Sequence, residues 1–126
     1  MSWLPASWPK RISLLLLAVF FVFAGVSHFT REEFFVKIVP PYLPAARFLV
    51  QASGVAEIAL GLAVLVPQWR ALAGWGLLAL LVAVYPANIH MALHPEQFPD
   101  TSSTFLYARL PFQFLFAAWA WWATRP

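Results

Sequence analysis

The sequence predicts an all-α protein, a four-helix transmembrane bundle that forms a single membrane domain over residues 1–126. Of its residues, 62% are hydrophobic and only 10% are charged, which lies outside the range of soluble domains. Four long apolar stretches each approach the roughly 20 residues that cross a bilayer as a helix. Runs such as the four consecutive leucines at 14–17 do not alternate, which argues against membrane β-strands.

The four membrane helices are expected at about residues 11–29, 45–66, 70–93 and 104–124. A short amphipathic helix is expected at about residues 31–39, between the first two membrane helices. It should lie at the outer interface. Thr30 and Glu33 match a capping box for this interfacial helix. Pro44 is expected in the first turn of the second membrane helix.

The connections between the later helices differ in length. Residues 67–70 leave room only for a tight turn, so the second and third membrane helices should be antiparallel neighbours. The longer connection at 94–104 ends in a polar stretch, residues 100–104, which is expected to cap the last helix. Pro86 and Pro111 each remove one helical hydrogen bond and should leave backbone carbonyls available to other donors.

Lysine and arginine residues near the helix ends give the expected orientation. Both termini are predicted to be cytoplasmic, because slightly more of these residues gather on that side. The net charge of +3 is small and indicates contact with the lipid bilayer, not with nucleic acid. The two groups are Lys10, Arg11, Arg70 and Arg125 on one side, and Arg31, Lys37 and Arg47 on the other.

Glu57 is the residue that most suggests a function. It lies about 15 Å below the start of its helix, near the middle of the membrane. An ionised carboxylate there costs several kcal/mol unless it is paired or neutralised. A protonated acid or a buried ion pair that joins helices is the structural alternative. Gly54 and Gly61 share the face of Glu57 and would allow another helix to approach closely.

Other polar residues fall in the outer half of the expected bundle. Arg109 and Gln113 are expected to lean outward as Glu57 does, and His28 and Asn88 inward, so the two sets can meet. Together they predict one polar pocket that opens toward the outer leaflet, with Glu57 and His28 as a candidate proton relay. The alternatives are that the amides only join helices and that the arginine extends to the headgroups. The predicted ligand-binding residues are His28, Glu57, Tyr85, Asn88, Arg109 and Gln113.

The chain contains no cysteine, so a disulfide, a thiolate-bound metal and an iron–sulfur cluster are excluded. No haem and no structural metal are expected either, and any redox role must use a bound carrier. A metal site built from His28, Glu57 and His90 is the weakest possibility, because His90 lies about 200° around its helix from Asn88.

Several short strings of residues, in order along the chain, resemble DoxX-like small bacterial integral membrane proteins. They are residues 24–29, 38–40, 43–44, 53–58 with Gly61, 86–90 and 109–113. The resemblance implies a four-helix multipass protein of the bacterial inner membrane. The namesakes of that family are linked to quinone-coupled oxidation of sulfur compounds, and more distant relatives act as membrane chaperones. Without cysteine, this chain cannot share any function of the family that depends on thiols.

The leading hypothesis is that the pocket binds a quinone or a lipid-like molecule and serves a membrane redox system, with Arg109 or Gln113 donating to carbonyl oxygens of the ligand. The alternative is a non-catalytic membrane subunit, or a chaperone or assembly factor for another membrane protein, with its small-residue stripes docking onto that partner. A homo-oligomer is also possible. A third hypothesis is an enzyme acting on a sterol-like or lipid substrate through Glu57 and His28, so catalytic activity stays an open question.

Overall fold

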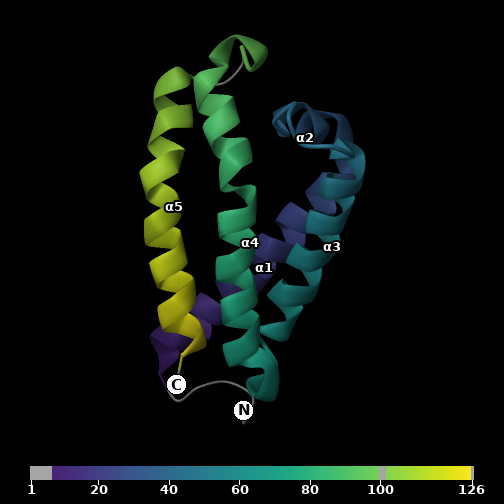
Figure 1. Ribbon diagram of the computed structural model, residues 1–126. Coiled ribbons are helices and arrows are strands. Elements are labelled where there is room, and N and C mark those ends of the chain that lie inside the picture. The colour runs from purple at the N-terminus through teal and green to yellow at the C-terminus, as the bar shows by residue number, and fades with distance from the viewer. Residues whose placement is uncertain (1–6, 100–101, 126) are drawn as a thin grey trace.

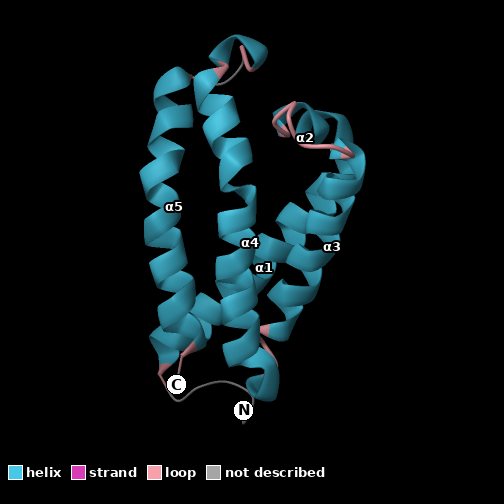
Figure 2. Cartoon of the chain, viewed as in Figure 1, coloured by secondary structure: helices cyan, strands magenta, loops and turns pink. Residues whose placement is uncertain are grey.

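The computed structural model describes residues 7–99 and 102–125 and confirms an all-helical chain, with no strand in that part (Figures 1 and 2). Four long helices are joined by one short α-helix and one 3-10 turn. In chain order the elements are α1 (Trp8–Thr30), α2 (Glu32–Ile38), α3 (Ala46–Ala63), α4 (Pro67–Leu93), η1 (Pro95–Gln97) and α5 (Ser103–Thr124).

Three of the helices, α1, α3 and α4, are long and apolar enough to cross a membrane. The fourth expected segment also forms a helix, α5, which has 22 residues. α5 is not among the three because polar residues such as Arg109 and Gln113 lower its hydropathy. The helical class is therefore confirmed, and the fourth membrane crossing stays a prediction.

The long helices form two pairs. α1 packs along α3 and α4 packs along α5, and the pairs converge near the chain termini and diverge toward the other end (Figure 1). We call the converging part the closed end. Inside a bilayer, van der Waals packing between helices stabilises such a contact more than exclusion of water does. The buried residues of the closed end are Leu14, Leu17, Ala18, Phe21, Val64, Ala73, Leu77, Ala120 and Ala123.

At the opposite end, α2 bridges the two pairs. Ile38 of α2 is buried in a cluster with Met91 and Ala92 of α4, Phe98 after η1 and Leu106 of α5. This contact exists because α2 is amphipathic and turns its apolar face toward the tops of α4 and α5. The two pairs are thus joined at both ends, by the closed end and by α2.

Close contact between α1 and α3 depends on glycine. A Cβ atom on Gly25 would lie 2.5 Å from the carbonyl oxygen of Gly54, and one on Gly54 would lie 2.9 Å from the carbonyl oxygen of Gly25. The predicted small-residue face of Gly54, Glu57 and Gly61 is therefore correct, since all three are buried on α3. Small residues let two backbones approach in this way in membrane helix pairs.

The start of α2 differs from the prediction. Thr30 is the last residue of α1, and Arg31 takes the N-cap position of α2 without any side-chain cap. The predicted capping box is wrong, because the backbone of Thr30 remains in the preceding helix. The carboxylates of the first turn instead contact α3: Glu33 accepts a hydrogen bond from Arg47 at 2.8 Å, and Glu32 accepts one from Gln51 at 2.8 Å.

The proline positions correct two helix boundaries. Pro67 is the first residue of α4 and not part of the turn, because its fixed φ and missing N–H suit that position. The turn is residues 64–66, and Arg70 Nε donates to the carbonyl of Val64 at 2.7 Å. Pro44 lies outside α3, which begins only after Ala45 adopts a left-handed conformation, with φ of 55°.

The predicted cap of the last helix is confirmed at Ser102. Its Oγ accepts a hydrogen bond from the N–H of Phe105 at 3.1 Å and so satisfies one of the free donors at the start of α5. Residues 100 and 101, which belong to the same polar stretch, lie outside the described residues.

Candidate functional site

His28 and Glu57 meet in the interior of the α1–α3 pair. His28 Nδ1 lies 2.9 Å from Glu57 Oε2, and the two side chains are only 10% and 11% exposed. The two atoms are at ion-pair distance, and no hydrogen bond joins them. Neither atom has another hydrogen-bond partner among the described residues. Two buried polar atoms are therefore left without a satisfied hydrogen bond, which costs free energy.

Helix geometry explains why these two side chains meet. His28 follows Gly25 by three positions and Glu57 follows Gly54 by three, so each lies on the same helix face as its glycine. The close approach of the two glycines therefore brings the acid and the imidazole together. Phe35 of α2 covers the pair from the outer end, with its ring edge-on to the His28 ring at 4.2 Å between centroids.

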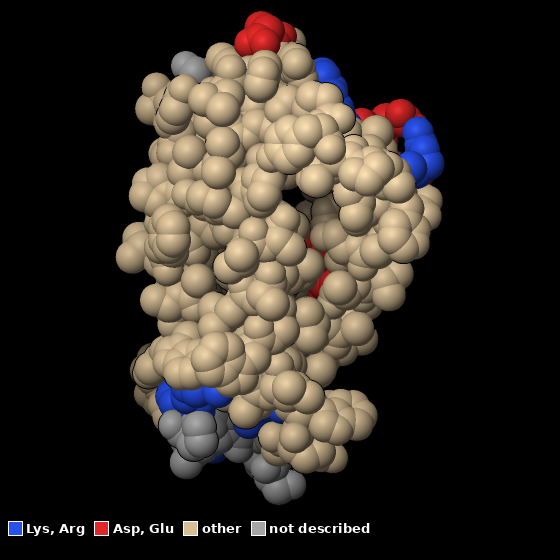
Figure 3. Space-filling model, in the orientation of Figure 1, with Lys and Arg blue, Asp and Glu red and all other residues tan. Residues whose placement is uncertain are grey.

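A hollow opens beside this pair. The space-filling view shows the hollow between α4 and the α2–α3 side of the molecule, with acidic atoms at its floor (Figure 3). Glu57 is buried on α3, one of the helices that border this hollow. The lateral hollow, as we call it, lies between the closed end and the α2 bridge.

A second polar cluster joins α4 to α5. Asn88 Nδ2 donates to Gln113 Oε1 at 2.6 Å, and Gln113 Nε2 donates to the carbonyl of Leu81 at 2.6 Å. Tyr85 donates to the carbonyl of Leu110 at 3.2 Å. The acceptor carbonyls, Leu81 and Leu110, are not the ones that Pro86 and Pro111 release, so the carbonyls freed by the prolines stay a prediction.

Arg109 completes this second cluster. One terminal nitrogen donates to Asn88 Oδ1 at 3.1 Å and the other to the Met91 sulfur at 3.4 Å. Its guanidinium also lies 5.9 Å from the centre of the Phe105 ring. No acidic side chain lies within ion-pair distance of Arg109 among residues 7–99 and 102–125.

The structure thus divides the six predicted site residues into two groups. His28 and Glu57 lie between α1 and α3, and the other four lie between α4 and α5. No hydrogen bond or ion pair joins the groups in the described part of the chain. The residues expected around a single pocket are therefore bonded in two groups, because α4 and α5 turn their amide side chains toward each other. The second group is Tyr85, Asn88, Arg109 and Gln113.

Comparison with known proteins gives the family. Residues 17–124 match the family described as a domain of unknown function, DUF8561. The chain belongs to this family. No curated protein and no solved structure matches it. Both polar clusters lie inside the DUF8561 domain, and the resemblance to DoxX-like proteins stays a prediction.

The DUF8561 domain does not assemble the metal site that was considered. Within the described ranges, no group of three or more histidine and acidic residues could hold a metal ion. His90 is buried beside His94, at 4.4 Å between ring centroids, and does not join His28 and Glu57.

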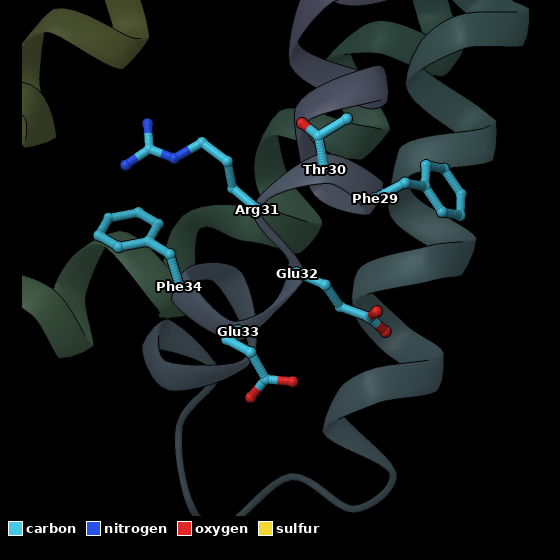
Figure 4. Close-up of a pocket in the computed structure, with 6 residues that line it drawn as sticks. All are labelled: Phe29, Thr30, Arg31, Glu32, Glu33 and Phe34. Carbon is cyan, nitrogen blue, oxygen red and sulfur yellow. The ribbon is translucent and has the colours of Figure 1, made fainter.

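The domain also has a surface depression where α1 meets α2 (Figure 4). Its acids already have partners, because Glu32 and Glu33 both pair with Arg47, and Arg31 lies over the Phe34 ring at 5.3 Å. We therefore assign it a structural role in holding α2 against α3. It is lined by Phe29, Thr30, Arg31, Glu32, Glu33 and Phe34.

Two interior contacts of the DUF8561 domain could not be predicted from its sequence. Phe35 belongs to the predicted interfacial helix, but its contact with His28 depends on how α2 folds back. Trp119 Nε1 donates to Ser13 Oγ at 2.9 Å and ties α5 to α1 at the closed end. No sequence signal marks this bond, because its partners lie at opposite ends of the chain.

Proposed function

We propose that this DUF8561 chain is a DoxX-like multipass protein of the bacterial inner membrane. In this proposal it binds a quinone or a similar lipid-like molecule in the lateral hollow and serves a membrane redox system through that molecule. The observation that carries the proposal is the buried pair of His28 and Glu57, whose facing polar atoms lack a hydrogen bond beside a hollow that opens sideways.

The chemistry of the pair suits a mostly apolar ligand with a polar head. A carbonyl oxygen of a quinone accepts a hydrogen bond from the His28 N–H, and a hydroxyl of the corresponding quinol donates one to Glu57 Oε2. Either bond recovers the free energy lost by the unsatisfied atoms. An opening to the side of the bundle also suits a ligand that is dissolved in the bilayer.

The same pair can move protons. Its two facing atoms are 2.9 Å apart, a distance across which acid and imidazole exchange a proton. A quinone takes up protons on reduction, and an acid next to an imidazole at its head can supply them. Because the chain has no cysteine, it has no thiol or iron–sulfur centre, so in this proposal the electrons come from a bound carrier or from a partner protein.

A four-span topology completes the proposal. The 22 residues of α5 extend over about 33 Å, which is enough to cross the hydrocarbon core, and α5 packs along α4. At the closed end the described charged residues are all basic, which supports a cytoplasmic location for that end and for both termini (Figure 3). These residues are Lys10, Arg11, Arg70 and Arg125.

The non-catalytic subunit, the assembly factor and the homo-oligomer have less support. Their docking was expected to use stripes of small residues, but all five glycines pack against other parts of the same chain. Gly25, Gly54 and Gly61 lie between α1 and α3, Gly74 faces Thr124, and Gly76 faces Leu60. The glycines are therefore not available to a partner, and the exposed small residues that remain are alanines such as Ala52, Ala59 and Ala79.

Ligand recovery tests the proposal. The wild type, Glu57→Gln and Glu33→Gln are purified in mild detergent, and bound quinones and lipids are extracted and quantified by mass spectrometry. We expect Glu57→Gln to retain about one tenth of the wild-type ligand, which corresponds to about 1.4 kcal/mol. Glu33→Gln, which changes an exposed acid, should match the wild type. Equal recovery from Glu57→Gln, with unchanged helicity, would exclude the pair as a binding site. If the protein is instead an enzyme that acts on this ligand, the purified wild type would convert the ligand to product without any other protein.

A further inference from the structure

We infer that Arg109 forms a second binding site, on the α4–α5 pair, that takes a phosphate group from an anionic phospholipid or from free phosphate. This site is distinct in its bonding from the pair beside the lateral hollow, since no hydrogen bond or ion pair connects Arg109 to His28 or Glu57 in the described chain.

The first argument is charge. Arg109 is partly buried, yet none of the described acids pairs with it: Glu32 and Glu33 pair with Arg47, Glu57 pairs with His28, and Glu96 forms no ion pair with Arg109. Its contacts are an amide oxygen and a thioether, which are neutral. A guanidinium held within a helix bundle without a counter-charge is costly, so an anion from outside the described chain would stabilise it.

The second argument is the geometry of the guanidinium. It has five N–H donors, and only two of them have partners in the described chain. The rest of the planar fork is free to bind two oxygens of one phosphate, which is the geometry that arginine prefers. A thioether is a weak acceptor, so the Arg109 N–H that donates to it can readily donate to an anion instead.

The third argument is that the guanidinium is preorganised before any anion binds. Asn88 Oδ1 accepts from Arg109, while Asn88 Nδ2 donates to Gln113, which in turn donates to the carbonyl of Leu81. This chain of bonds fixes which way both amides point. The arginine is therefore tied across to α4 and does not extend freely toward the headgroups, and it loses less side-chain entropy when an anion binds.

The position of the site favours a phospholipid as the source. Arg109 is six residues into α5, about 9 Å from the start of the helix, a depth close to the headgroup region of the outer leaflet. The surface of α5 below it carries exposed apolar side chains, Phe112, Phe114 and Leu115, against which acyl chains can lie. One lipid could therefore place its phosphate at Arg109 and its chains along α5.

Lipid-dependent thermal stability in a neutral detergent tests this site. Phosphatidylglycerol, diacylglycerol with the same acyl chains, and inorganic phosphate are each titrated into the wild type and into Arg109→Gln, Arg109→Lys and Arg47→Gln. We expect phosphatidylglycerol to raise the Tm of the wild type and diacylglycerol to leave it unchanged. Arg109→Gln should bind phosphatidylglycerol at least about tenfold more weakly. Arg109→Lys should show a smaller rise in Tm, because lysine lacks the planar pair of donors of the guanidinium. Arg47→Gln, which removes an exposed arginine outside both polar clusters, should respond as the wild type does.

Each result decides the matter. A shift with inorganic phosphate alone supports the site and identifies free phosphate as sufficient. No shift of the wild type with either phosphate source, or an equal shift of Arg109→Gln, overturns the inference. Asp100 lies outside the described residues, so Asp100→Asn is measured too. The Tm values of Arg109→Gln, Asp100→Asn and the double variant are compared without added phosphate. If Arg109→Gln lowers the Tm of the wild type but not that of Asp100→Asn, Asp100 is the counter-charge of Arg109 and the inference is wrong.

Discussion

His28 and Glu57 stand one helical turn beyond two facing glycines, and their polar atoms approach to 2.9 Å inside the α1–α3 pair. The contact has a structural and a functional side. Paired polar groups inside a membrane hold two helices together, and an incompletely satisfied pair also offers hydrogen-bonding capacity to a ligand. Because the lateral hollow opens beside this pair, both effects are open to measurement.

A double-mutant cycle measures the coupling between the two residues. We expect His28→Ala and Glu57→Ala each to lower the free energy of unfolding, because each leaves one buried polar group without its neighbour. The interaction energy should reach at least about 1 kcal/mol. Unfolding in mixed micelles with a denaturing detergent provides the measurement. Effects that add to within about 0.3 kcal/mol would show that the 2.9 Å contact has no energetic consequence.

The glycine contact predicts a clear difference between two alanine substitutions. A Cβ at Gly25 would meet the Gly54 backbone, which cannot yield, so Gly25→Ala should cost about 1–3 kcal/mol. A Cβ at Gly76 would meet only the flexible end of Leu60, so Gly76→Ala should be neutral or should stabilise α4 by about 0.5–1 kcal/mol. Thermal unfolding of both variants in detergent is the measurement, and equal losses would contradict the assignment of Gly25 to a tight backbone contact.

The amide at Gln113 should contribute to stability as a link between helices. Gln113→Leu removes its bonds to Asn88 and to the carbonyl of Leu81, and should cost about 0.5–2 kcal/mol. Gln51→Leu is the matched control, since Gln51 is exposed and bonds only to Glu32. Hydrogen exchange of the α4 segment around Leu81 should become faster in Gln113→Leu alone. Unchanged exchange there would mean that the bond is not maintained in solution.

The absence of cysteine makes the membrane topology directly testable, because a single introduced thiol is the only one present. One cysteine is introduced at the start of α4, as Gln68→Cys, and another is added after Pro126. Both should react with an impermeant maleimide from the cytoplasmic side. Glu96→Cys and Thr104→Cys should react from the opposite side. Labelling of Thr104→Cys and of the added cysteine from the same side would show that α5 does not cross the membrane.

Local features of the fold could be predicted because they depend on short stretches of sequence. Apolar length gave the long helices, and the polar end of the 94–104 connection gave the cap at Ser102. The errors arose where two local signals compete. Thr30 has the chemistry of an N-cap but stays inside the preceding helix, and Pro67 has the chemistry of a turn but also suits the first position of α4.

The site was predicted in part. The glycine pattern correctly gave the helix face that Glu57 shares with Gly54, which is buried, while the depth of Glu57 in the membrane stays a prediction. Depth cannot give rotation around a helix axis or the choice of neighbour. The sequence therefore grouped Asn88, Arg109 and Gln113 with Glu57, whereas the packing of α4 on α5 separates them.

The sequence by itself determined an all-helical, strongly apolar chain without thiol chemistry and with one acid at mid-helix depth, because composition and periodicity act through the nearest residues along the chain. The tertiary structure alone decided that His28 is the neighbour of Glu57, that Arg109 is left without a counter-charge among the described residues, and that a hollow opens between α4 and the α2–α3 side. The physical reason is that these relations depend on how four helices rotate and pair, and that choice is made by packing between residues distant in sequence.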